Sequence, residues 1–110
     1  MDLVEQLFKL QNQLNASIKR LAETGRAFAE AERDYKITLR TEALKLRAEK
    51  GLPVTLIAQI IYGVPEVADL RFKRDIAETI YNTNQEHINS TKLQMRILEG
   101  QIQREWGSKN

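Results

Sequence analysis

The sequence predicts an all-α fold: an antiparallel, coiled-coil-like helical hairpin with a short connector helix, which we expect to pair into a four-helix bundle. Two long segments carry apolar residues mostly at steps of three and four, the period of one helical face, and the steps alternate over residues 77–102. Between them lies an aliphatic segment that has a glycine and a proline on each side, at 51–53 and at 63–65. A chain of 110 residues fits a single domain, which we place at 1–107 with a frayed tail at 108–110.

The first long helix is expected over residues 2–50, a segment with no proline and one glycine, Gly25. Glycine in a helix interior costs about 1 kcal/mol relative to alanine, so a kink or a break at Gly25 is an alternative. The apolar phase passes from Leu21 to Phe28 in one heptad, which favours a continuous helix. The expected apolar face consists of Leu3, Leu7, Leu10, Leu14, Ile18, Leu21, Phe28, Ala31, Tyr35, Leu39, Ala43 and Leu46.

The second long helix is expected over residues 65–106. Pro65 suits the first turn of a helix, and Glu66 and Asp69 lie where the helix dipole favours negative charge. Gly107 follows the last periodic residue and is expected to stop the helix. The expected face consists of Val67, Leu70, Ala77, Tyr81, Asn84, Ile88, Thr91, Met95, Leu98 and Ile102.

The connector, residues 51–64, is more apolar than a turn needs to be. Thr55 is expected to cap a short helix over 55–62. One interpretation is a hydrophobic plug that closes the end of the hairpin. The other is a docking surface for a partner, because exposed apolar patches mark interfaces. The candidate partner-binding residues are Leu56, Ile57, Ile60, Ile61 and Tyr62.

Several large apolar residues lie off the two expected seams. A two-helix hairpin buries one stripe per helix, so a second apolar face indicates a partner, and self-association into a homodimer is the simplest one. The surplus residues are Phe8, Leu44, Ile76, Ile80, Leu93 and Ile97.

Composition excludes several classes of function. The chain has no cysteine, which excludes disulfides and fits a reducing cytoplasm. No window is apolar enough for a membrane span, and the start has no secretion signal. The single histidine, His87, has no second metal ligand or nucleophile at a suitable spacing, so we expect a hydrogen-bonded or solvated residue. No cofactor, metal site or enzymatic activity is expected.

Asn84 stands on the expected seam of the second helix. A buried amide in a coiled coil can fix register and partner number. The alternative is a locally wet, weak stretch in which Asn84 faces the alanine-rich segment "RAFAEAE", residues 26–32.

Positive charge is concentrated around the connector, since residues 36–75 carry eight basic and five acidic side chains. The segment "TLIAQIIYGVPEVADLRFKR" is partly similar to a helix-turn-helix. Its spacing does not fit that motif, and Glu66 and Asp69 would point negative charge at DNA. Ordinary solvated pairs, such as Arg71 with Asp75, are the alternative to nucleic-acid binding. The candidate nucleic-acid-binding residues are Lys45, Arg47, Lys50, Arg71, Lys73 and Arg74.

Three segments carry a resemblance: "AEAERDYK" (29–36), "GLPVTLI" (51–57), and "EVADLRFKRDIAE" (66–78) through the terminal "REWG". With them the chain resembles small all-helical proteins encoded by temperate phages and prophages of Gram-positive bacteria, in the early recombination and replication region. The resemblance implies a bacterial cytoplasm and an accessory role through protein contacts. It assigns no binding residue.

The sequence therefore favours a non-enzymatic interaction module whose connector contacts a host or phage protein. Arg71, Lys73 and Arg74 would steer an acidic partner toward it. The competing hypothesis is a nucleic-acid-binding accessory protein that uses the basic residues around the turn.

Overall fold

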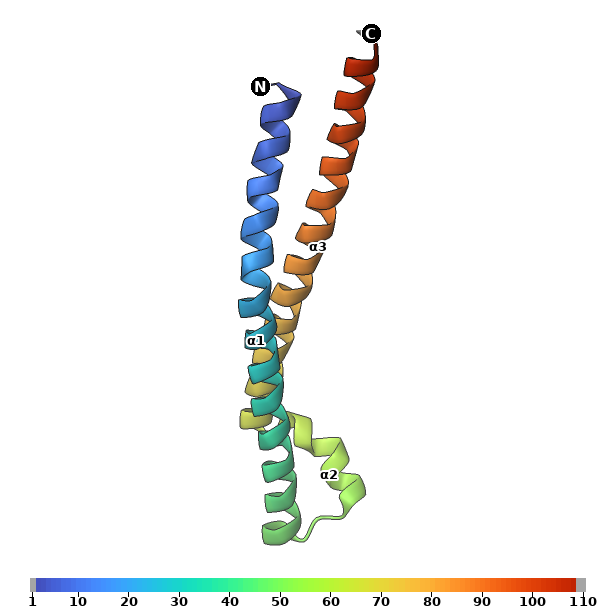
Figure 1. Ribbon diagram of the computed structural model, residues 1–110. Coiled ribbons are helices and arrows are strands. Elements are labelled where there is room, and N and C mark those ends of the chain that lie inside the picture. Colours follow the sequence, from blue (N-terminus) through green and yellow to red (C-terminus); the bar gives the residue numbers. More distant parts are fainter. Residues whose placement is uncertain (1, 109–110) are drawn as a thin grey trace. The chain divides into compact units, whose positions relative to one another are not determined.

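The computed structural model describes residues 2–108, and within that range every regular element is a helix. The long helices α1 (Leu3–Lys50) and α3 (Pro65–Ser108) run antiparallel, joined by the short helix α2 (Val54–Ile60) and the 3-10 turn η1 (Ile61–Gly63) (Figure 1). The predicted all-α hairpin with a connector helix is confirmed. The four-helix bundle stays a prediction.

The long helices differ from expectation mainly at one end. α1 runs through Gly25 without a break, as the heptad step across it predicted. α3 continues to Ser108, so the expected stop at Gly107 is wrong. Nothing lies within 4 Å of a Cβ built at Gly107, and its backbone is helical, so this glycine is not required by its geometry. Of the predicted frayed tail, Lys109 and Asn110 lie outside the described residues.

The C-terminus of α1 is closed by the backbone of the next two residues. Gly51 has a φ of 63°, the left-handed conformation that glycine adopts without strain. Its N–H donates to the carbonyl of Arg47 at 3.1 Å, and the N–H of Leu52 donates to the carbonyl of Leu46 at 3.4 Å. Leu46 and Leu52 both pack against one apolar cluster, and the bond from Gly51 to Arg47 is that of the left-handed C-cap motif.

The connector helix begins differently from the prediction. Pro53 is the N-cap of α2, with extended backbone and no side-chain cap. Its carbonyl accepts from the N–H groups of Leu56 and Ile57 at 3.1 and 3.0 Å. The capping role expected for Thr55 is therefore wrong, because Thr55 already lies inside the helix.

The chain divides into two compact units, which we describe separately. Within the described residues, unit 1 comprises 2–24 and 81–108, and unit 2 comprises 25–80. The single domain predicted over 1–107 stays a prediction. The boundaries fall at Gly25 in α1 and at Tyr81 in α3.

The core of unit 2 is apolar and involves all of its helices. Val67 from α3 has no exposed surface, and Tyr35 from α1 is buried beside it. Ile57 and Ile61 bring the connector onto the same cluster. Half-buried apolar residues complete the packing: Leu39, Ala43, Leu46, Leu52, Val64 and Leu70.

Unit 1 consists of two helical segments, and its buried seam is mixed. Ser17, Asn84 and Thr91 are buried polar residues. Ile18 was expected on the seam, but 48% of its surface is exposed and Ser17 takes the inward position. The buried apolar residues of this seam are Leu14, Ile88 and Leu98.

Among the described residues, no helix combines the length and the apolar character needed to cross a membrane.

Candidate interaction surfaces

The connector separates its apolar side chains into two sets. Ile57 and Ile61 are 7% and 4% exposed and belong to the core of unit 2, so they are not accessible to a partner in this fold. Leu56, Ile60 and Tyr62 are 39%, 40% and 45% exposed. The inward face of the connector packs as the plug interpretation predicted, and the docking interpretation stays a prediction for the face that is exposed to solvent.

Arg71 is the basic residue that belongs to this surface. Its guanidinium carbon lies 4.9 Å from the centre of the Tyr62 ring, within cation–π range. The predicted pair of Arg71 with Asp75 does not form, because Asp75 accepts from Arg74 at 2.8 Å instead. We call the exposed set Leu56, Ile60, Tyr62 and Arg71 the connector face.

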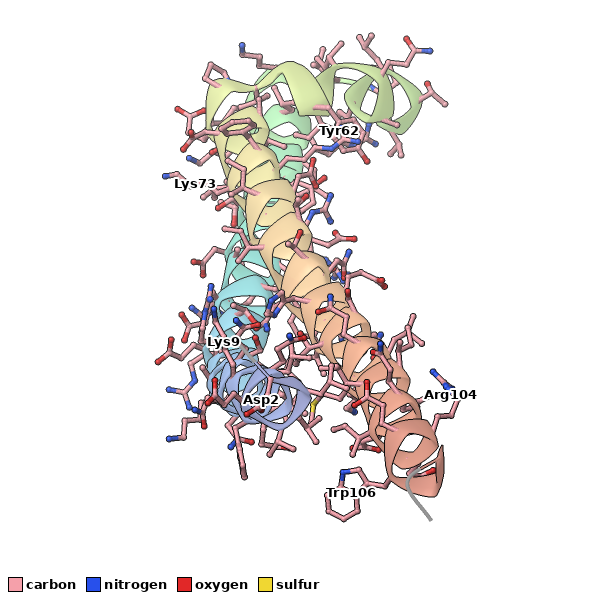
Figure 2. All side chains as sticks on the ribbon, turned by 90° about the horizontal axis from the view of Figure 1, so that it is seen from above. Asp2, Lys9, Tyr62, Lys73, Arg104 and Trp106 are labelled. Carbon is pink, nitrogen blue, oxygen red and sulfur yellow. The ribbon has the colours of Figure 1, made fainter. Side chains whose placement is uncertain are left out.

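Lys73 and Arg74 do not contribute to this face as expected. Lys73 pairs with Asp69 at 3.1 Å and points away from α2 (Figure 2). The guanidinium of Arg74 lies 4.8 Å from the centre of the Tyr35 ring, and its side chain is only 20% exposed. Lys73 is therefore exposed but paired and directed away from α2, and Arg74 is mostly covered, so neither adds free charge to this face.

Hydrogen bonding to Asp75 raises the pKa of Arg74 above its ordinary value, and burial opposes the shift. A nearby carboxylate of Glu32, 4.0 Å away, adds a weaker ion pair. Arg74 is therefore a structural cation between α1 and α3 in unit 2.

The three remaining cations of the nucleic-acid hypothesis lie near the end of α1. Lys45 pairs with Glu42 at 3.3 Å. Arg47 donates from Nη1 to the carbonyl of Leu52 at 2.9 Å, so its side chain is bonded to the segment that follows α1. Lys50 is exposed. The cluster is brought together in unit 2, but most of its charge is already balanced or engaged locally.

A second apolar surface in unit 2 lies on α3 alone. Phe72, Ile76 and Ile80 are all exposed and recur at steps of four, around a shallow hollow of about 250 Å³. Ile76 and Ile80 were recognised as surplus, but Phe72 was missed, although the step of four would have revealed it.

All the surplus residues predicted to lie off the seams are exposed, which confirms a second set of apolar side chains outside the core. They are Phe8, Leu44, Ile76, Ile80, Leu93 and Ile97.

Asn84 in unit 1 connects the two helices through its side-chain amide. Its Nδ2 donates to the carbonyl of Ser17 at 3.1 Å, and its Oδ1 accepts from the hydroxyl of Thr24 at 2.9 Å. Asn84 thus faces residues 17–24, and the expected pairing with residues 26–32 is wrong. Because both ends of the amide are used, this contact supports the register interpretation.

His87 is hydrogen-bonded, as expected: its Nδ1 lies 2.7 Å from the hydroxyl of Ser17. Within residues 2–108, no group of three acidic, histidine or cysteine side chains is placed to hold a metal ion.

A third surface is a groove of about 520 Å³ between the two helices of unit 1, and half of its lining residues are glutamines.

Comparison of the chain with protein families, with curated proteins and with solved structures finds no match.

Proposed function

We propose that this protein is a non-enzymatic interaction module that binds another protein through its connector face. The carrying observation is the division of the connector: Ile57 and Ile61 anchor it to the core, whereas Leu56, Ile60 and Tyr62 stay exposed. Because its buried face fixes the connector helix in place, the backbone beneath the exposed side chains has little conformational entropy to lose on binding, which suits a docking role.

The charge beside the face indicates the chemistry of the partner. Arg71 makes no ion pair with the described residues and stacks on the exposed ring of Tyr62. Tyrosine and arginine are among the residue types enriched at binding hot spots. The proposed partner is therefore a protein segment that combines apolar side chains with a carboxylate.

The resemblance noted from the sequence supplies the setting of the proposal. We place the module in a bacterial cytoplasm, with a host or phage protein as its partner. A chain without cysteine suits such a reducing compartment.

The proposal is tested by capture from host lysate with matched variants. The first, Leu56→Ser/Ile60→Ser, removes exposed apolar surface from the connector; the control, Ile37→Ser/Leu44→Ser, removes exposed apolar surface from α1 in the same unit. We expect a captured protein to be lost with the first variant and with Arg71→Glu, and kept with the control. Circular dichroism checks that all variants fold.

A captured protein that responds equally to both double variants contradicts the connector face, and so does the absence of any captured protein. Titration with single- and double-stranded DNA at low salt distinguishes the competing hypothesis. Nucleic-acid binding through the six cations would weaken steeply as salt is added. The engagement of Lys45, Arg47, Lys73 and Arg74 leads us to expect no such binding.

A further inference from the structure

The groove of unit 1 lies between the first part of α1 and the last part of α3. Its floor includes Leu10 from α1 and Leu98 from α3. Its walls carry four glutamines, at 6 and 13 in α1 and at 94 and 101 in α3. Each pair is one heptad apart, so both helices present a glutamine column on the same side of the seam.

These wall positions flank a coiled-coil seam, where glutamate and lysine are the usual residues. Here the lining has a single charged side chain, Lys9, and no acidic one. Ile97 also lines the groove and is 58% exposed. Gln94 makes only a long hydrogen bond, of 3.4 Å, to the hydroxyl of Ser90 on its own helix. The groove is thus a partly apolar surface between two helices, with Lys9 as the charged side chain in its lining.

We propose that this groove is the interface between two copies of the chain, which pack groove to groove about a twofold axis. In a twofold interface each surface meets its own copy, so a wall of one charge would repel itself. A glutamine amide both donates and accepts a hydrogen bond, so a glutamine wall is complementary to itself. The flexible stem of Lys9 lets its ammonium turn toward solvent.

The charge of unit 1 agrees with a second copy and disfavours a strongly charged partner. Apart from His87, residues 2–24 and 81–108 carry six acidic and six basic side chains. Two such surfaces approach without net repulsion. A nucleic acid or a strongly acidic protein would gain little attraction here.

The proposed contact between two copies must be larger than the groove alone. Stable interfaces use roughly 20–30 residues per side, which is more than this groove supplies. The pairing therefore extends along both helices, and the exposed Leu93, one turn before Ile97, is the neighbouring apolar residue that it would cover. This site is separate from the connector face, so neither proposal rests on the other.

The first test is the molar mass of the full chain by sedimentation and light scattering, across about a hundredfold dilution. We expect a dimer that dissociates on dilution. A monomer at every concentration overturns the proposal.

The second test locates the interface. Gln13→Glu/Gln101→Glu places like charges on both walls, and Gln11→Glu/Gln103→Glu adds the same charge two residues away, outside the groove lining. At low salt we expect the first variant to raise the dimer dissociation constant by about tenfold or more, because like charges meet across the axis. The second variant should change it little.

The third test asks whether the occupant is a second copy. Gln13→Lys/Gln101→Lys should also dimerise poorly by itself, yet mixing it with Gln13→Glu/Gln101→Glu should restore a dimer of the two variants. Circular dichroism confirms that each variant is helical. If both glutamate variants dimerise like the wild type, or if mixing restores nothing, the groove is not the interface.

Discussion

The two units of this chain differ in the residues that they bury between their helices. In unit 2 the connector adds a third helical element to α1 and α3, so Tyr35 and Val67 are buried among apolar neighbours. In unit 1 two helices face each other alone, and the seam contains Ser17, Asn84 and Thr91. Two helices enclose only a narrow stripe, whereas a third element widens the core.

The difference teaches where stability and specificity reside. Apolar burial contributes free energy without direction, so unit 2 should carry most of the stability. Hydrogen bonds such as those of Asn84 are directional, so unit 1 should set the alignment of its helices. The following substitutions test this division, from the largest expected effect to the smallest.

Ile61→Ala should lower the free energy of unfolding by about 2–4 kcal/mol, because it removes a nearly fully buried side chain from the core of unit 2. Ile60→Ala, the adjacent residue on the exposed side, should cost about 1 kcal/mol or less. Urea denaturation followed by circular dichroism measures both. Equal effects would mean that the connector is not anchored by its inward face.

Asn84→Ala should lower the free energy of unfolding by about 1–3 kcal/mol, since the carbonyl of Ser17 and the hydroxyl of Thr24 lose their partner. Asn82→Ala, two residues away and exposed, should stay within about 0.5 kcal/mol of the wild type. The same denaturation experiment applies. A cost at Asn84 no larger than at Asn82 would remove the register role.

Arg74→Ala should cost about 1 kcal/mol, because Arg74 loses its contact with the Tyr35 ring and its bond to Asp75. Lys73→Ala, whose ion pair is exposed, is the control and should cost about 0.5 kcal/mol or less.

The raised pKa of Arg74 also predicts a pH dependence. Because the pKa of Arg74 is raised by folding, its charged form stabilises the fold at every pH below the ordinary pKa of arginine, and this stabilisation is lost only above it. The difference in the free energy of unfolding between Arg74→Ala and the wild type should therefore be the same at about pH 6 and pH 9. A difference that shrinks within this window would show that another group titrates in the pair.

Thr55→Ala should change the free energy of unfolding by less than about 0.5 kcal/mol, since Thr55 lies inside α2 and caps nothing. A true capping threonine would cost about 1 kcal/mol when replaced by alanine. Thermal denaturation compares Thr55→Ala with the wild type. A loss of stability of about 1 kcal/mol would show that Thr55 caps the helix, as the sequence suggested.

Local patterns predicted the helices well. The period of three and four identified both long helices, and the step from Leu21 to Phe28 correctly carried α1 through Gly25. The pattern also separated the surplus residues, such as Ile97, from the seam. These features depend on the spacing of residues within one helix.

The contacts between helices were predicted less well from the sequence. The register that places Asn84 against Ser17 and Thr24 depends on where α1 ends and on the path of the connector, and neither is encoded near Asn84. At position 18 the hydrophobic pattern favoured the larger side chain, but Ser17 is the buried residue, and its hydroxyl is hydrogen-bonded to His87. The groove was missed because glutamine columns carry no apolar signal.

The closure of α1 at Gly51 has a consequence for the order in which the chain folds. The left-handed glycine and the bond from Leu52 to Leu46 begin the reversal of the chain that the connector completes before α3. Contacts beside such a reversal close short loops and lose little chain entropy, so they form early. We expect residues near the turn to nucleate the hairpin, with pairing then advancing like a zipper toward the two termini. Replacing Gly51 with alanine would thus delay the first step of folding rather than only weaken the last.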